Sequence, residues 1–97
     1  PGMISIGNNV TIGSNVMVFA HYNPTANALL KESGYPREVK KVTINDGAVI
    51  GPGSIIIAGT TIGKNSIIGA GSVVSNEIPD CSVAIGNPAR VIKKIKF

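Results

Sequence analysis

The sequence predicts an all-β fold, a parallel β-helix of about three triangular coils. A β-branched residue opens every six-residue block between positions 44 and 79, and the residue four places later is small in five of the six blocks. An α-helix or a flat strand would instead repeat at about 3.6 or 2 residues. A short strand followed by a tight corner accounts for the longer period, and three such sides close one coil. The β-branched residues are Ile44, Ile50, Ile56, Ile62, Ile68 and Val74.

Glycines at the corners support the same geometry. Gly51, Gly63 and Gly69 each directly follow a β-branched residue, and Gly suits a corner whose dihedral angles or crowding exclude a Cβ. We expect the β-branched and the small residues to point inward, and successive coils to stack about 4.8 Å apart. An ordinary sandwich of short strands is the alternative, but it would place its turn residues at wider and less regular intervals.

The period also occurs upstream, at Ile6, Ile12 and Val18, and is then interrupted, because Ile44 is out of step with Val18. An insertion therefore leaves the coil and returns to it. The segment after the last repeat has lost the period and is expected to cover the open end of the prism. We expect a single domain over residues 1–97, with a coil at 4–21, a loop arm at 22–41, further coils at 42–79 and a C-terminal cap at 80–97.

The arm is longer than the roughly 12–15 residues that an unstructured loop of a compact domain usually spans without a function. Asn23-Pro24 is expected to begin a turn, and Thr25 to cap a short helix that reaches Leu30 and ends at Gly34. Either a plain surface decoration or an arm over a site or a neighbouring subunit fits this pattern. We favour the second, because the only His of the chain lies at the root of the arm.

The composition indicates a thin, β-rich core. Hydrophobic residues make up 43% of the chain but aromatic residues only 4%, so we expect the protein to associate with copies of itself. No apolar run approaches the roughly 18 residues of a membrane span, and no membrane partner is expected. The single Cys81 cannot form an internal disulfide, which fits a cytoplasmic location. Because the chain begins with Pro1 and not Met, we expect its N-terminus to be truncated.

The chain carries a net charge of +4, and its last eight residues are notably basic. A basic end is often only a solvated terminus, but it also suits an anionic partner. Nucleic acid is not expected as a partner, because the basic residues are few and no aromatic residues are interleaved with them to stack on bases. The basic residues of this end are Arg90, Lys93, Lys94 and Lys96.

With one His and one Cys, the chain offers little material for catalysis. A zinc site needs three or four protein ligands, so no metal is expected, and no nucleophile-elbow pattern occurs. His21 remains as a candidate general base, since an imidazole that titrates near neutrality can take a proton from an attacking hydroxyl or amine. A surface His without a role is the plainer interpretation, which the position of His21 beside the long arm disfavours.

The repeats, the His followed by a long loop and the ending IPDCSVAIGNPARVIKKI together resemble the hexapeptide-repeat acetyltransferases. The resemblance spans residues 4–95 and is strongest to the sugar O-acetyltransferase branch, which includes maltose and galactoside acetyltransferases. It implies a left-handed β-helix, an exception to the usual right-handed crossover. It also implies a homotrimer, acetyl-CoA in the cleft between two prisms, and direct acetyl transfer to a small-molecule acceptor with His21 as base.

The resemblance further implies where the cofactor would bind. The family uses backbone groups of the later coils along the pantetheine arm, and two cations match positions that meet the phosphates, where exposed contacts weaken with salt. Small residues at these positions also serve simply to pack a corner. The matching residues are Ala58, Gly59, Ala70, Ser75 and Asn76 for the arm, and Arg90 and Lys93 for the phosphates.

The sequence departs from the family at one point. In the family, the backbone N–H of the residue after the "IG" pair stabilises the thioester oxyanion, but here that residue is Pro52, which has no N–H. Either the N–H of Gly53 or the hydroxyl of Ser54 substitutes for it, or the protein lacks this donor. The loss of one such donor typically costs about 10²–10³ in rate.

Three functions follow as hypotheses. The first is a trimeric acetyltransferase that acts on a hydroxyl of a sugar or glycoside. The second is a non-catalytic trimeric β-helix that serves as a structural or binding module. The third is an acetyltransferase with an amine or antibiotic acceptor. The acceptor itself is not encoded in the repeats, so the sequence leaves its identity open.

Overall fold

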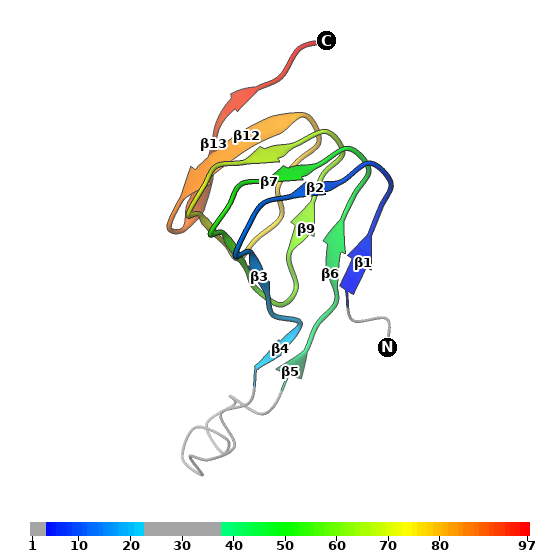
Figure 1. The fold of residues 1–97 in the computed structure, drawn as a ribbon, viewed down its shortest axis with the longest axis vertical. Coiled ribbons are helices and arrows are strands. Elements are labelled where there is room, and N and C mark those ends of the chain that lie inside the picture. The colour runs from blue at the N-terminus through cyan, green and yellow to red at the C-terminus, as the bar shows by residue number, and fades with distance from the viewer. Residues whose placement is uncertain (1–3, 23–37) are drawn as a thin grey trace.

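Three stacks of short parallel strands close around one apolar interior in the computed structural model, which shows the left-handed parallel β-helix that the sequence and the resemblance predicted (Figure 1). The structure describes residues 4–22 and 38–97, and the side chains of residues 21, 22, 38 and 39 are not included in that description. The helix expected between Thr25 and Gly34 therefore lies outside the described residues.

Each coil contributes one strand to each stack. Stack A contains β1, β6 and β9, stack B contains β2, β7, β10, β12 and β13, and stack C contains β11, β8 and β3. A separate antiparallel pair, β4 and β5, forms the root of the arm. The bounds are β1 Ile4–Ile6, β2 Thr11–Ile12, β3 Met17–Val18, β4 His21–Tyr22, β5 Glu38–Val39, β6 Val42–Ile44, β7 Val49–Ile50, β8 Ile55–Ile56, β9 Thr61–Ile62, β10 Ile67–Ile68, β11 Val73–Val74, β12 Ser82–Gly86 and β13 Ala89–Lys94.

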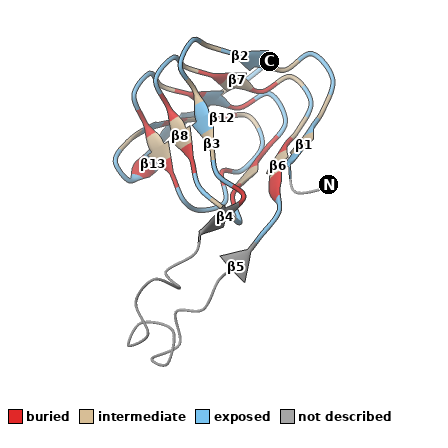
Figure 2. Ribbon diagram, turned by 60° about the horizontal axis from the view of Figure 1, so that its bottom comes forward, coloured by how far each residue is buried: buried red, intermediate tan, exposed pale blue. Residues whose placement is uncertain are grey.

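The six-residue period separates the side chains that point into the interior of the prism. Ile44 pairs with Ile62 in stack A, Ile50 with Ile68 in stack B and Ile56 with Val74 in stack C, and all six side chains are at most 1% exposed. Figure 2 shows the buried residues recurring at the same places from coil to coil. The small residues four places later are buried too, as expected from the sequence: Ala48, Ser54, Thr60, Ser66 and Ser72.

The interior hydroxyls satisfy carbonyl groups at the corners. Thr60 donates from Oγ1 to the carbonyl oxygen of Val74 at 3.1 Å, and Ser66 donates from Oγ to that of Pro79 at 2.6 Å. Every buried side-chain nitrogen or oxygen among the described residues has a hydrogen-bond partner. Ser and Thr therefore fit these positions because they are small and because they pair backbone groups that would otherwise be buried without a partner.

Crowding and dihedral angle act at different corner positions. A Cβ on Gly51 would lie 2.6 Å from the nitrogen of Ala70 in the next coil, so the position directly after the β-branched residue is closed by crowding. Positive φ occurs two residues further on, at Gly53 and Gly71 (φ 74° and 70°) and at Asn65 (φ 56°). Asn tolerates the left-handed region better than most side chains, so either Gly or Asn occupies this second position.

The two ends of the prism differ. In the first coil the inward residues Ile6 and Ile12 are 49% and 43% exposed, because no layer of the described residues lies beneath them. At the other end Ile78 bridges to Ile62, and β12 pairs in parallel with β10, so stack B gains a further strand where the sequence shows no period. β13 then folds back antiparallel to β12. Within the described ranges there is no helix long and apolar enough to cross a membrane.

Candidate active site

The corners of successive coils lie above one another and form three long edges of the prism. Two of them carry the residues that the sequence predicts as functional. Edge BC, between stacks B and C, contains residues 51–54 and 69–72, and edge CA, between stacks C and A, contains residues 57–60 and 75–77. Each edge is continuous because backbone hydrogen bonds join its corners, as Gly71 N–H does by donating to the carbonyl oxygen of Pro52 at 2.9 Å.

Edge CA holds four of the predicted cofactor residues. Ala58 and Gly59 form the corner of the second coil, and Ser75 and Asn76 form the corner directly above, with all but Ala58 exposed. Gly59 has a φ of +85°, and a Cβ there would come within 3.3 Å of Lys40 Cδ. Small side chains therefore leave the backbone of this edge accessible to an extended ligand.

The root of the arm rises from the same edge. β4 and β5 pair with His21 opposite Val39, and Lys40 N–H donates to the carbonyl oxygen of Ala20 at 2.9 Å. Ala20 is 6% exposed and anchors this root in the core. The backbone of His21 is therefore held at edge CA by two strands and a buried neighbour.

Both predicted oxyanion donors lie on edge BC and already have partners. Gly53 N–H donates to the carbonyl oxygen of Ser14 at 2.8 Å, and Ser54 donates from Oγ to that of Gly69 at 3.1 Å. Ser54 is also fully buried. Their role stays a prediction, and it requires these hydrogen bonds to be shared or opened when an acyl group binds.

Ala70 is exposed on edge BC, and Arg90 and Lys93 lie on β13 at the end of the neighbouring stack B. The register of β12 with β13 shifts by one residue between Val83 and Ala84, so that β13 contains one extra residue. Because of this bulge, Arg90 opposite Ile85 and Lys93 opposite Val83 face the same outward side of the sheet, although residues three apart in a regular strand face opposite sides.

The four basic residues at the end of the chain therefore do not form one group. Lys94 lies opposite Ser82 and donates from Nζ to Ser82 Oγ at 2.9 Å and to the carbonyl oxygen of Asp80 at 3.2 Å, so it closes the end of the prism. The side chains of Arg90 and Lys93 have no hydrogen-bond or ionic partner among the described residues. The sequence carries no signal for this division, because the bulge that produces it has no residue signature.

A single copy of the chain does not bring the predicted site together. The backbone of His21 and four cofactor residues share edge CA, whereas the oxyanion candidates, Ala70 and the cation pair belong to edge BC and stack B. The described part of the chain encloses no pocket between them. It also contains no group of three or more His, Cys, Asp or Glu residues that could hold a metal ion.

Comparisons with known proteins agree with this architecture. The family model described as bacterial transferase hexapeptide (six repeats) matches residues 41–76, and the model of the hexapeptide repeat of succinyl-transferase matches residues 3–20. A galactoside O-acetyltransferase of Lactococcus lactis is 42% identical over 92 residues, which are 95% of this chain and 44% of that protein. The chain belongs to the hexapeptide-repeat transferase family. The family that the sequence predicted is thereby confirmed.

Two solved structures extend this membership to three dimensions. A maltose O-acetyltransferase from Clostridium difficile is 49% identical, with a TM-score of 0.85 over 97% of this chain and 49% of that one. A galactoside acetyltransferase in complex with coenzyme A is 40% identical, with a TM-score of 0.85 over 96% of this chain and 46% of that one. This hexapeptide-repeat chain thus spans less than half the length of these relatives.

Proposed function

We propose that the protein is an acetyltransferase that moves acetyl from acetyl-CoA to a hydroxyl of a sugar or glycoside. The observation that carries the proposal is the match, over nearly the whole chain, to the galactoside acetyltransferase that was solved with coenzyme A. Two features of the chain itself support it. Arg90 and Lys93 form an outward cation pair without an acidic partner among the described residues, and edge CA exposes small residues beside the root of the arm.

In this proposal His21 acts as general base within a ternary complex. It takes the proton of the acceptor hydroxyl as that oxygen attacks the thioester carbonyl, and the C–S bond then breaks to release the CoA thiolate, which receives the proton. General-base catalysis of this kind contributes about 10²–10⁴ in rate. Gly53 or Ser54 would stabilise the oxyanion, at the cost of sharing the hydrogen bond that each makes in the folded chain.

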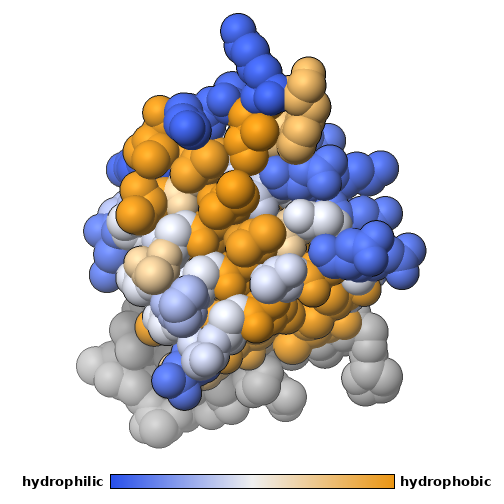
Figure 3. Space-filling view, turned by 45° about the horizontal axis from the view of Figure 1, so that its top comes forward, coloured by the Kyte–Doolittle hydropathy of each residue, from blue (hydrophilic) through white to orange (hydrophobic). Residues whose placement is uncertain are grey.

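We propose a homotrimer on the basis of the outward faces. The outward residues of stack B are mainly apolar (Val49, Ile67 and Val83 in register), as are those of stack C (Met17, Ile55 and Val73), whereas those of stack A are Ser5, Thr43 and Thr61. Figure 3 shows hydrophobic side chains gathered in a band across the face that it views. Two apolar faces and one polar face suit a ring in which every copy contacts two neighbours.

The proposed trimer would also complete the site. Edge CA of one copy, with His21, Ala58, Gly59, Ser75 and Asn76, would meet edge BC of the next, with Ala70 and the nearby cation pair. The cleft between two straight edges suits an extended pantetheine arm. A cytoplasmic location, expected from the single Cys81, is part of the same proposal.

A non-catalytic trimeric module is the second candidate function. It is favoured by one observation, namely that Gly53 N–H and Ser54 Oγ are both engaged within the fold while Pro52 has no N–H to offer. The two candidates differ in CoA binding. Titration calorimetry of the protein with CoA would show binding that weakens with salt for the enzyme, and no heat of binding for the module.

The activity is tested by incubating the protein with acetyl-CoA and a panel of glycosides, amines and antibiotics, and by measuring free CoA with a thiol reagent. We expect turnover with glycosides, a loss of about 10²-fold or more in His21→Ala, and partial recovery of that variant in added imidazole. Because His21 is the only His of the chain, no other imidazole can replace it in the variant. Release of CoA at the background rate with every acceptor, or an undiminished His21→Ala, contradicts the proposal.

A further inference from the structure

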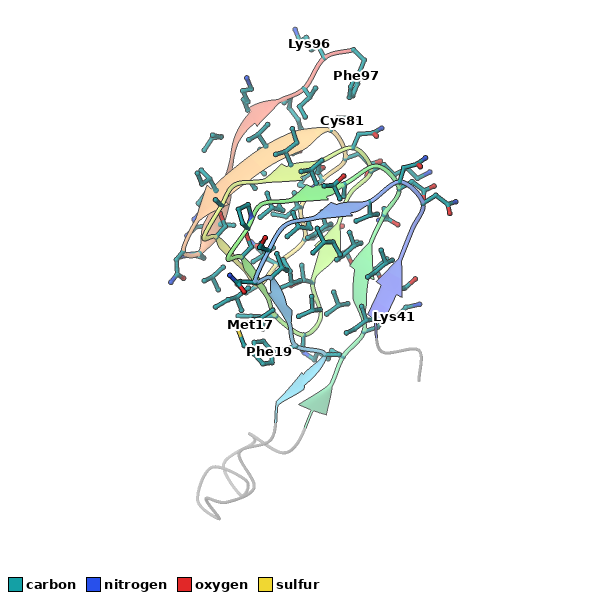
Figure 4. The ribbon with its side chains drawn as sticks, in the orientation of Figure 1. Met17, Phe19, Lys41, Cys81, Lys96 and Phe97 are labelled. Atoms are coloured by element: carbon teal, nitrogen blue, oxygen red, sulfur yellow. The ribbon has the colours of Figure 1, made fainter. Side chains whose placement is uncertain are left out.

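Phe19 and Ile57 form an exposed apolar patch on edge CA, here called the acceptor patch. Phe19 is 44% exposed and Ile57 36% exposed, although both belong to the regular coils. Figure 4 shows Phe19 at the end of β3, beside Met17 and next to the point where the chain passes into β4. An aromatic ring at this place is unusual for the chain, which has only two Phe and two Tyr.

The backbone hydrogen bonds fix the patch within the coils. Phe19 N–H donates to the carbonyl oxygen of Ile56 at 2.8 Å, and Ile57 N–H donates to that of Val74 at 2.9 Å. Phe19, Ile57 and Ser75 therefore occupy the same position in three successive coils. Val18 pairs with the buried Ile56, so Phe19, which follows Val18, projects away from the core.

The patch adjoins both parts of the proposed reaction. Ser75 is one of the proposed cofactor residues, and Ala58 directly follows Ile57. His21 follows Phe19 by two residues, which limits the separation of their Cα atoms to about 7 Å. A group of the size of one sugar ring that rests on Phe19 would therefore lie within reach of the proposed base.

The patch is distinct from the faces assigned to association. Met17 continues the outward column of stack C, with Ile55 and Val73 in register. Phe19 and Ile57 lie beyond that column, at the edge itself. In the proposed trimer they would lie in the cleft where edge CA meets edge BC of the next copy, beside the covered apolar face and not within it.

We infer that the acceptor patch binds the apolar face of the acceptor's pyranose ring, with Phe19 as the specificity-determining contact. The inference rests on the proposed function and deepens it. One face of a pyranose ring presents mainly C–H groups, which pack on an aromatic ring, while the hydroxyls point from the rim. A ring that lies on Phe19 leaves its rim hydroxyls free, on the edge that carries the backbone of His21.

The test measures acceptor and cofactor separately in Phe19→Ala, Phe19→Tyr and a matched control. Ile12→Ala is the control, because Ile12 is 43% exposed in the same coil but lies in stack B. We expect Phe19→Ala to raise the KM for methyl and nitrophenyl pyranosides roughly tenfold, the change that one lost aromatic contact produces. The KM for acetyl-CoA should stay unchanged, Phe19→Tyr should behave as wild type, and Ile12→Ala should change neither KM.

Three outcomes overturn the inference. The first is an unchanged acceptor KM in Phe19→Ala, and the second is an equal rise in both KM values. The third is a loss of association in Phe19→Ala, seen by sedimentation, which would make a neighbouring copy the occupant of the patch. Calorimetric titration of methyl pyranosides into wild type and Phe19→Ala separates this inference from the proposed function. Glycoside binding that depends on Phe19 supports the patch even if no acetyl is transferred, and equal or absent binding contradicts it.

Discussion

Substitution of Gly51 by Ala tests how tightly the coils stack. The added Cβ would lie 2.6 Å from Ala70 N and 2.7 Å from the carbonyl oxygen of Ile68, both backbone atoms that cannot rotate away. Relief requires the second and third coils to separate locally by close to an ångström, which costs about 1–3 kcal/mol as overpacking. It also weakens the 2.8 Å hydrogen bond from Gly51 N–H to Ile68, worth about 1 kcal/mol. We expect Gly51→Ala to destabilise the protein by about 2–4 kcal/mol.

The assay is urea unfolding followed by far-ultraviolet circular dichroism, since the chain has no Trp. At a typical m of about 1–3 kcal/mol per molar urea, the midpoint should fall by about 0.7 M or more. It is measured at one protein concentration because association contributes to stability. Gly71→Asn is the matched control on the same edge, because its Cβ meets nothing within 4 Å and Asn already occupies positive φ at Asn65. If Gly51→Ala and Gly71→Asn shift the midpoint equally, the coils are not stacked as closely as described.

Two further predictions concern the outward faces and the cap. Ile67→Asp, on the apolar face of stack B, should shift the sedimentation of the protein toward single copies while its circular dichroism is preserved. Thr61→Asp, on the polar face of stack A, should leave the sedimentation unchanged. Equal sedimentation of the two variants would contradict the assignment of faces. Ser66→Ala removes the acceptor for Ser82 N–H at 3.1 Å and the donor to the carbonyl oxygen of Pro79. It should lower the free energy of unfolding by about 1–3 kcal/mol and accelerate amide hydrogen exchange at Ser82. Ser14→Ala, on the surface, should leave that exchange unchanged.

The interior of this fold was predictable from the sequence because burial and chain geometry share one period. The β-branched residues from Ile44 to Val74 recur every six residues, which is the interval at which the chain points a side chain into the prism. No tertiary contact changes that interval. The added strand β12 could not be predicted in the same way. Its inward residues are Ser82 and Ala84, which fill a rung at the end of the prism without the β-branched residue on which the period depends.

The candidate site was predictable as a set of residues but not as an arrangement. The position of His21 beside the arm and the small residues of the later corners follow from sequence spacing. The three sides expected for each coil already fix the edge, BC or CA, that each corner joins. The repeats do not show how the edges of two copies would meet. The common orientation of Arg90 and Lys93 depends on a bulge, and a one-residue register shift in a hairpin leaves no composition signature.

The division of the site between two edges makes a prediction that a site within one copy does not share. His21→Ala damages edge CA, and Ala70→Trp would block edge BC with a bulky side chain at an exposed position. Each variant alone should lose nearly all acetyl transfer. When the two are co-expressed and assemble at random, a site forms from an intact edge CA and an intact edge BC in about a quarter of the clefts of a cyclic trimer. Activity should therefore return to about a quarter of the wild-type value, with wild-type KM values in the restored sites. If each site lies within one copy, every copy carries one damaged edge and the mixture stays as inactive as its parts.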